Sequence, residues 1–235
     1  GSGGAPHNRW ETAANWSLGT VPDGDDDVII ANVTYDPVIA DGTNPTINYL
    51  EIAGGADLTC GANTITVDGE KGGKCLKFSG SGVFTAGTST IIITTADDSI
   101  LDCDPSAGSF NNLTFNASSQ TFTLEKNLTI GGNLTITAGE LDTVNSGGTD
   151  WELTVAGTTT VVGTLVCNAS TISLGSGLTS DWGLAVSSGG TFTGGSGTHT
   201  IGSIFVSSGG IRTVTLSSGA TTIDSKNTGN GFTIN

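Results

Sequence analysis

From about Ile47 onward, the chain repeats one short pattern: apolar side chains alternate with Thr, Asn or Ser over a few residues, and a glycine-containing turn follows. Strict alternation places the aliphatic and Phe side chains on one face, which predicts half-buried strands of about four to six residues. Glycine ends these strands because it adopts positive φ without steric cost. The clearest strands are expected at residues 49–52, 75–78, 112–115, 127–130, 133–136, 152–155, 183–186 and 203–206.

Corresponding positions recur at intervals typical of one coil of a solenoid. Three related segments, AVSSGGTF at 185–192, FVSSGGIR at 205–212 and TLSSGATT at 215–222, follow one another at steps of 20 and 10 residues. Self-similarity on this scale indicates a repeat architecture, in which each unit buries its apolar face against its neighbours. Starting from Asn127, further landmarks follow at steps of 25, 31 and 20 residues, at Glu152, Gly183 and Ser203.

The fold class that follows is all-β: a right-handed parallel β-helix, or β-solenoid, with an N-terminal capping segment. A β-sandwich is the alternative, because many short strands with glycine turns also suit that fold. Hairpin signals such as Asn-Gly or Asp-Gly are scarce between the strands, and parallel coils do not need them.

Proline and acidic residues divide the chain unevenly. All 5 prolines lie at or before Pro105, and so do 15 of the 22 acidic residues. We therefore expect residues 1–46 to form the capping segment and residues 47–235 to form one continuous solenoid. Residues 231–235 read GFTIN, a strand-like alternation without a polar cap, and an uncapped solenoid end favours contact with another subunit. We expect neighbouring subunits to hold residues 1–8 and 231–235 by strand exchange or head-to-tail stacking.

Two segments resemble a known class of proteins. Residues 10–30, WETAANWSLGTVPDGDDDVII, resemble the opening of many repeat-rich β-helical surface proteins and virion appendage proteins. Residues 110–143, with two copies of Asn-Leu-Thr-Ile, are similar to repeats of secreted, adhesin-like β-solenoids. The resemblance implies an architecture and an extracellular or virion-surface setting, and it implies no activity.

Composition and charge narrow the classes of partner. Only 12% of the residues are charged and 35% are hydrophobic, which argues against disorder. The net charge of −15 argues against nucleic acid or an anionic membrane as a partner, because both require a basic surface. No apolar run has the length of a membrane-spanning helix. The few lysines and the many Ser and Thr residues favour an extracellular or cell-surface location.

The densest acidic run is a candidate calcium site, because Ca²⁺ prefers clustered oxygen ligands. An EF-hand is excluded, since the twelfth position counted from the first aspartate is Thr34 rather than Glu. The alternative is a solvated turn before the strand that starts near Val28. The four residues of the run are Asp23, Asp25, Asp26 and Asp27.

The cysteines show no CxxC spacing and have no nearby His, so a zinc site is not expected. Disulfides in an oxidising compartment and buried free thiols both remain open, and the spacing assigns no pairing. The four residues are Cys60, Cys75, Cys103 and Cys167.

Seven Asn-x-Ser/Thr sequons are candidate glycosylation sites in a host that glycosylates proteins. Strand repeats containing Asn-Leu-Thr also generate such sequons without any role for a glycan. The sequons begin at Asn15, Asn32, Asn112, Asn116, Asn127, Asn133 and Asn168.

Aromatic and acidic residues offer two further kinds of site. Trp10 and Trp16 are expected to plug the first coil, whereas Trp151 and Trp182 could present a sugar-stacking surface. Carboxylates on adjacent coils could serve a glycosidase, although few Arg and Lys residues accompany them. The acidic residues in question are Asp97, Asp98, Asp102 and Asp104, and the two histidines, His7 and His199, have no identifiable triad partner.

These observations lead to one leading hypothesis and two alternatives. We expect a structural, self-assembling extracellular protein without catalytic or cofactor-binding residues: the subunit of a surface filament, sheath or virion appendage, with copies of itself as partners. The first alternative is a carbohydrate-binding adhesin or phage tail-fibre or decoration module. The second, which the composition favours least, is a glycan-cleaving β-helix enzyme.

Overall fold

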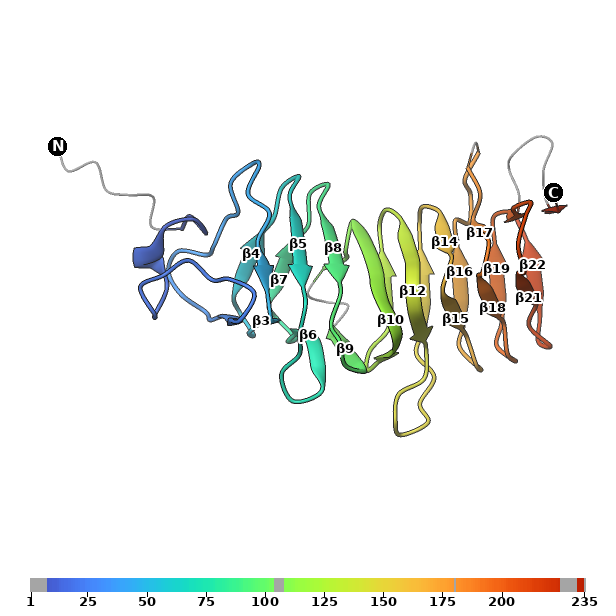
Figure 1. Ribbon diagram of the computed structural model, residues 1–235, viewed down its shortest axis with the longest axis horizontal. Coiled ribbons are helices and arrows are strands. Elements are labelled where there is room, and N and C mark those ends of the chain that lie inside the picture. The colour runs from blue at the N-terminus through green and yellow to red at the C-terminus, as the bar shows by residue number, and fades with distance from the viewer. Residues whose placement is uncertain (1–7, 104–107, 180, 225–231, 235) are drawn as a thin grey trace.

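The computed structural model describes residues 8–103, 108–179, 181–224 and 232–234 of the 235-residue chain. It is an all-β solenoid of about eight turns, in which short strands stack along one axis (Figure 1). The short 3-10 helix η1 (Ala13–Asn15) is the one helical segment among these residues. The predicted fold class, a parallel β-solenoid, is therefore confirmed.

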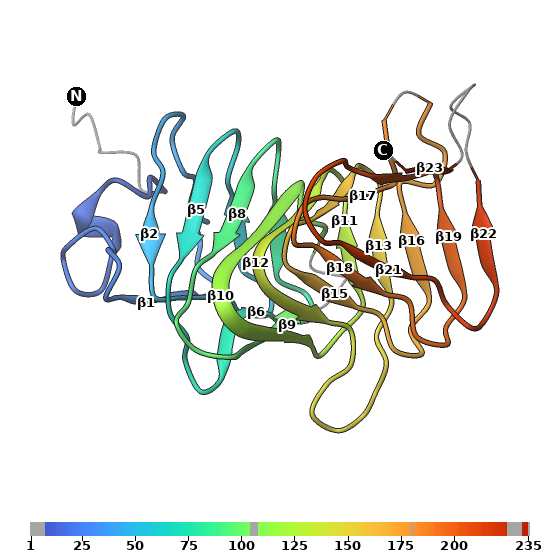
Figure 2. The same ribbon diagram turned by 45° about the vertical axis from the view of Figure 1, so that its right-hand side comes forward.

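Most turns contribute a strand to each of three faces. Face 1 consists of β1 (Asp27–Ile30), β3 (Tyr49–Ile52), β6 (Lys74–Phe78), β9 (Ser99–Cys103), β15 (Thr164–Val166), β18 (Thr191–Thr193) and β21 (Thr213–Thr215). Face 2 consists of β2 (Thr46–Ile47), β5 (Thr64–Val67), β8 (Thr90–Ile93), β14 (Thr159–Val161), β17 (Leu184–Val186), β20 (Ile204–Val206) and β23 (Phe232–Ile234). Face 3 consists of β4 (Asp57–Thr59), β7 (Val83–Thr85), β11 (Leu128–Ile130), β13 (Leu153–Val155), β16 (Ile172–Leu174), β19 (His199–Ile201) and β22 (Thr221–Ile223), several of which stand side by side in Figure 2.

Two long strands belong to two faces at once. β10 (Asn112–Leu124) pairs with β8 through its first residues and with β9 through its last ones. β12 (Leu134–Asp142) follows the same path and pairs with β14 and then with β15. Both strands therefore continue around the corner between faces 2 and 1, and they join these faces into one 16-stranded sheet.

Every pairing between named strands of the described residues is parallel and joins consecutive turns. A β-sandwich would need antiparallel strands, and the antiparallel contacts here are two isolated bridges, Lys71 with Lys74 and Val144 with Asp150. The sandwich alternative is therefore wrong.

The register explains which of the sequence intervals measure a turn. Leu128 pairs with Leu153 on face 3, and Leu184 pairs with Ile204 on face 2, so the 25- and 20-residue steps each span one turn. The 31-residue step compares different faces, because Leu153 pairs onward with Ile172. The 10-residue step between the Ser-Ser-Gly segments likewise joins two successive corners of one turn.

The N-terminal segment is only partly a cap. Trp10 is buried, its ring centroid lies 4.8 Å from that of Trp16, and the Trp16 indole N–H donates to the Trp10 carbonyl (2.7 Å), so this pair closes the first turn as predicted. However, β1 already pairs in register with β3, with Val28 and Ile30 pointing inward. The solenoid therefore begins inside residues 1–46, earlier than the sequence suggested.

The interior is filled by apolar side chains in register from turn to turn. On face 2, Leu113 pairs with Leu134, and both are fully buried. Phe115 and Phe122, which lie on either side of the bend in β10, pack with their ring centroids 4.8 Å apart. At a corner, the backbone of Asn168 approaches Gly195 so closely that a Cβ would lie 1.9 Å from the Asn168 oxygen, and Gly195 adopts φ of +66°. Tight corners of this kind admit only glycine.

A histidine side chain also occupies this apolar interior. His199 is fully buried on β19, in register between Ile172 and Thr221, and its ring centroid lies 6.1 Å from that of Phe192. Neither ring nitrogen has a hydrogen-bond partner among the described residues. Burial therefore lowers the pKa of His199 below its ordinary value of 6.5.

Replacing His199 by Leu should remove part of the acid sensitivity of the fold. As the pH falls below about 6.5, the unfolded chain takes up a proton at this position before the folded chain does, so the free energy of unfolding falls by at most about 1.4 kcal/mol per pH unit. Urea unfolding between pH 7 and pH 5 should show a smaller decline for His199→Leu than for the parent chain. The outward-facing Thr200→Ala serves as the control, and equal declines in all three proteins would contradict a buried neutral His199.

Candidate functional site

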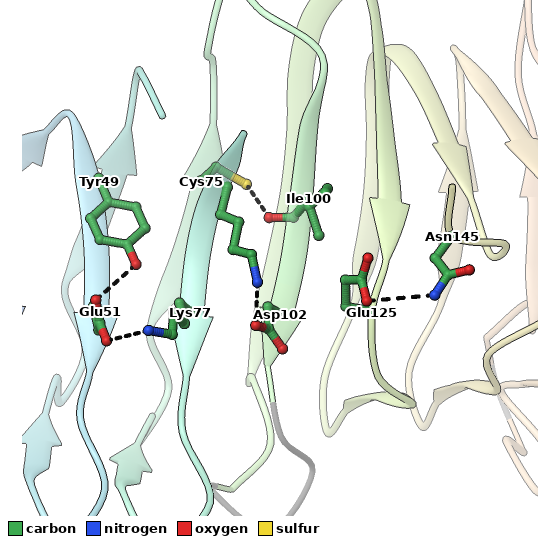
Figure 3. A network of polar contacts seen from close by, with 9 residues as sticks. Tyr49, Glu51, Cys75, Lys77, Ile100, Asp102, Glu125 and Asn145 are labelled. Atoms are coloured by element: carbon green, nitrogen blue, oxygen red, sulfur yellow. Dashed lines mark hydrogen bonds and ion pairs between the residues drawn. The ribbon is translucent and has the colours of Figure 1, made fainter. Parts of the chain in front are cut away.

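A ladder of ion pairs crosses successive turns on the outer surface of face 1 (Figure 3). The Lys77 ammonium lies 2.7 Å from Glu51 Oε1, and the Tyr49 hydroxyl donates to Glu51 Oε2 at 3.0 Å. One turn further along, Lys74 Nζ lies 2.5 Å from Asp102 Oδ2. A third pair joins Lys71 Nζ to Asp27 at 3.0 Å. In each pair a lysine of the β6 region reaches an acid on another turn, which is the adjacent turn for Lys77 and Lys74 and lies two turns away for Lys71.

Two carboxylates of this ladder, those of Glu51 and Asp27, are held in their charged form. Partial burial by itself would raise the pKa of Glu51, but the hydrogen bonds from Lys77 and Tyr49 and the charge of Lys77 outweigh it and lower the pKa. The same balance holds at Asp27, where Asn48 and Lys71 overcome burial and lower the pKa. Burial and the nearby Glu51 raise the pKa of the Tyr49 hydroxyl, which therefore stays protonated as a hydrogen-bond donor. The ladder thus joins turns through fixed charges.

Two of the acids considered for sugar chemistry, Asp98 and Asp102, are engaged in structural contacts through their carboxylates. Asp102 faces outward as its alternation predicted, and it is bound by Lys74. Asp98 Oδ1 accepts the Thr121 backbone N–H at 2.6 Å, and the Asp97 backbone N–H donates to the hydroxyl of Thr95. Residue 104 lies outside the described residues. None of these described contacts pairs one of the acids with another.

Further along face 1, the surface becomes more acidic. Burial raises the pKa of the Glu140 carboxyl, and the charges of Asp142 and Asp98 raise it further. Asp142 in turn accepts a hydrogen bond of 2.5 Å from the Asn168 side chain. Sequence analysis did not single out Glu140, because its partial burial and its proximity to Asp98 follow from the stacking of turns, and only Asp142 lies nearby in the chain.

The four cysteines are free thiols inside the solenoid: Cys60, Cys75, Cys103 and Cys167 are all buried and form no disulfide. Burial raises the pKa of Cys75 to about 12, and its Sγ contacts the Ile100 carbonyl oxygen at 3.6 Å. On the paired strands β6 and β9, Cys103 lies opposite Phe78 rather than opposite Cys75, so these two thiols do not face each other in the ladder. Burial also raises the pKa values of the Cys103 and Cys167 thiols.

The acidic run before β1 forms a hydrogen-bonded turn. Asp26 Oδ2 accepts the Asp23 backbone N–H at 3.1 Å, and Asp23 Oδ1 accepts the Asp25 backbone N–H at 3.2 Å. Asp27 is bound by Lys71 and by the side chain of Asn48. No group of three or more His, Cys, Asp or Glu side chains in the described part of the chain could hold a metal ion. The backbone contacts of Asp23 and Asp26 are those of a hydrogen-bonded turn, and the calcium site stays a prediction.

Four of the sequon asparagines bridge neighbouring turns. Asn112 Oδ1 accepts the Asn133 backbone N–H at 3.0 Å, and Asn133 Oδ1 accepts the Thr158 backbone N–H at 2.8 Å. Asn127 binds the backbone of Glu152 in the same way, and Asn168 binds Asp142. The Asn-Leu-Thr repeats thus place an asparagine at a corner, where it caps the next strand.

The remaining sequons lie at the surface. Asn15 donates from its side chain to the Arg9 carbonyl at 2.8 Å. Asn32 and Asn116 are exposed on the outside of the solenoid. Of the seven candidate glycosylation sites, Asn32 and Asn116 therefore leave the most room for a glycan.

The two outer tryptophans differ in their surroundings. Trp151 packs against the hydrophobic core, and the Lys126 ammonium lies 5.9 Å from its ring centroid. Trp182 stacks on Phe205, with ring centroids 5.0 Å apart and planes at 27°, and both side chains are partly exposed. Phe205 is the outward-facing residue of β20, so the pair forms an aromatic surface beside face 2.

Exposed apolar side chains gather at the two ends of the stack rather than along it. Two adjoining hollows of about 340 and 190 Å³ open beside β1, and both are lined by Trp16, Ser17 and Ile29. Of the eight large hydrophobic side chains that are exposed among the described residues, Val83 alone belongs to the middle turns. The other seven are Leu18, Val21, Ile29, Val33 and Tyr35 near the first turn, and Ile211 and Leu216 in the last turn described.

Comparisons of the chain with protein-family models, curated proteins and solved structures found no match. The fold and its contacts define the class of protein, a parallel β-solenoid. In the described residues, no helix has the length and apolar character needed to cross a membrane.

Asn133→Ala should destabilise the solenoid by about 1 kcal/mol, because the Thr158 backbone N–H loses its side-chain acceptor. The matched control is Asn116→Ala, at an exposed position of β10, where the change should stay within about 0.5 kcal/mol. Urea unfolding followed by circular dichroism measures both effects. Equal midpoints for the two variants would show that the asparagine bridges contribute nothing to stability.

Proposed function

We propose that this chain is a structural, self-assembling protein whose solenoids stack end to end. The observation that carries the proposal is the location of the large exposed apolar side chains: of the eight in the described part of the chain, seven lie on the end turns. Monomeric proteins rarely leave contiguous apolar surface exposed, and such surface is typical of protein–protein contacts. A second copy can extend the pattern of stacked turns only at the two ends of the solenoid.

The strand edges at the same two ends support the proposal. Among the described residues, β1 pairs with a strand on one side only, and so do β21 and β22. Such edges carry backbone N–H and C=O groups that can pair with another strand. Because all strands run parallel from turn to turn, a second copy in the same orientation would extend the existing ladder. A head-to-tail contact of this type generates an open filament.

The setting is proposed as extracellular or cell-surface, as part of a surface filament, a sheath or a virion appendage. The net charge of −15 argues against nucleic acid and anionic membranes as partners, because both require a basic surface. The resemblance of residues 10–30 to the opening of β-helical surface proteins points in the same direction.

A carbohydrate-binding adhesin or tail-fibre module is the second candidate. It is favoured by the stacked, partly exposed pair Trp182 and Phe205, because the amphipathic rings of such side chains suit binding surfaces that are both apolar and wet. Glycan binding that is lost on Trp182→Ala would support this candidate. Trp151 packs against the core but is also partly exposed, so its contribution to sugar binding stays a prediction.

The chain should associate in a concentration-dependent way, and Val33→Asp should weaken this association at least tenfold. Val33 is 51% exposed beside the larger hollow, so a charge there disrupts an end contact without entering the core. Val83→Asp is the control, because Val83 is 39% exposed on β7 in the middle turns. Sedimentation velocity and electron microscopy provide the readout. A parent chain that stays monomeric up to millimolar concentration, or equal association by both variants, would refute end-to-end assembly.

A further inference from the structure

The corner between faces 2 and 1 forms a continuous column from the first described turn to the last. The Asp26 carbonyl accepts the Asn48 backbone N–H at 3.0 Å, which joins the first two members of the column. At the other end, the Thr191 N–H donates to the Gly163 carbonyl, and the Gly189 N–H donates to the Ile211 carbonyl at 2.8 Å. In a head-to-tail stack, the corner at Ile211 of one copy therefore faces the corner at Asp26 of the next.

The corner of the last turn projects an apolar and a basic side chain. Ile211 is 86% exposed, the highest value among the exposed large hydrophobic side chains. Arg212 donates from its guanidinium to the carbonyls of Gly209 (2.8 Å) and Gly210 (2.6 Å), which fixes the loop. Arg212 forms no ion pair with any other described residue. The loop thus offers one hydrophobic side chain next to one cation.

The corner of the first turn is apolar and acidic, which complements Ile211 and Arg212. The smaller hollow beside β1 is lined by apolar side chains, Leu18 and Ile29 among them, and by Asp26. Asp23 and Asp25 are exposed next to it, and they form no ion pair among the described residues. Asp27, in contrast, already forms an ion pair with Lys71.

We propose that the loop containing Ile211 and Arg212 of one copy docks on the surface beside β1 of the next copy. Ile211 covers the hollow around Ile29, and Arg212 pairs with the carboxylates of Asp23 and Asp25. This inference rests on the proposed end-to-end assembly and names its contact. Arg212 is the one cationic side chain among the described residues of the last turn, and Asp23 and Asp25 carry the opposite charge on the first turn. This charge complementarity identifies a second copy of the chain as the occupant.

Charge exchange between the two corners tests the contact. Arg212→Glu should weaken assembly at least tenfold, because a carboxylate then faces Asp23 and Asp25, and Asp25→Arg should weaken it because two cations meet. An equimolar mixture of the two variants should assemble again, since each tail then meets a head of opposite charge. Lys126→Glu, which makes the same change of charge beside Trp151, is the matched control and should assemble like the parent chain.

Assembly of the parent chain and of the variant mixture, measured by sedimentation velocity at low and at 0.5 M salt, decides between the outcomes. Weaker assembly at high salt and rescue in the mixture to assemblies longer than a dimer support the proposed contact. The unaltered ends of the two variants give dimers only, and longer assemblies require the Arg212→Glu loop to dock on the Asp25→Arg surface. If the parent assembles and Arg212→Glu assembles equally well, the contact is wrong while end-to-end assembly stands. If the parent does not assemble at all, both proposals fail.

Discussion

The structure depends on the parallel hydrogen-bond ladder that holds each turn in register with the next. A single turn contributes only one short strand to each face and cannot bury its apolar side chains alone. Register aligns the inward residues of successive turns, such as Leu113 with Leu134, so that they form continuous buried columns. Side chains alternate between the two sides of a strand, so a shift by one residue would turn every inward side chain outward. The register therefore also determines which side chains form the core.

Once the interior is fixed, chemical variety is confined to the corners and the outer surface. Asparagines at corners, such as Asn133, cap the strand of the next turn, and lysines of the β6 region bind acids on neighbouring turns. These contacts join turns and leave the ends of the stack as the places where apolar groups and unpaired strand edges remain exposed. The proposed assembly uses the same interactions that hold consecutive turns together within one chain.

Much of this architecture follows from local sequence, because alternation and glycine corners act within a few residues. The strand near residues 49–52 and the turn spacing between Asn127 and Glu152 were predicted correctly for that reason. Alternation separates inward from outward residues but does not assign a strand to one of three faces, which is why the 31-residue step was misinterpreted. The start of the solenoid at β1 was missed because prolines surround that strand.

The polar contacts were harder to predict than the strands. Glu51 and Lys77 are 26 residues apart and Lys74 and Asp102 are 28 apart, intervals close to the length of a turn. Opposite charges at the repeat interval were a usable signal for this ladder. The stacking of Trp182 on Phe205 likewise spans neighbouring turns. The interior position of all four thiols needed the register itself, because a buried cysteine and a paired one look alike in sequence.

Disulfide trapping tests the register most directly. Thr135 and Thr160 are outward-facing register partners on β12 and β14, so Thr135→Cys combined with Thr160→Cys should form a disulfide rapidly under mild oxidation. Thr135→Cys combined with Val162→Cys places the thiols two residues out of register, beyond the about 7 Å between Cα atoms that a disulfide spans, and should stay reduced. The parent chain, with its four buried thiols, reports any background reaction. Rapid trapping of the first pair alone is the predicted result, and equal trapping of both pairs, or of the second alone, would contradict the stacked parallel turns.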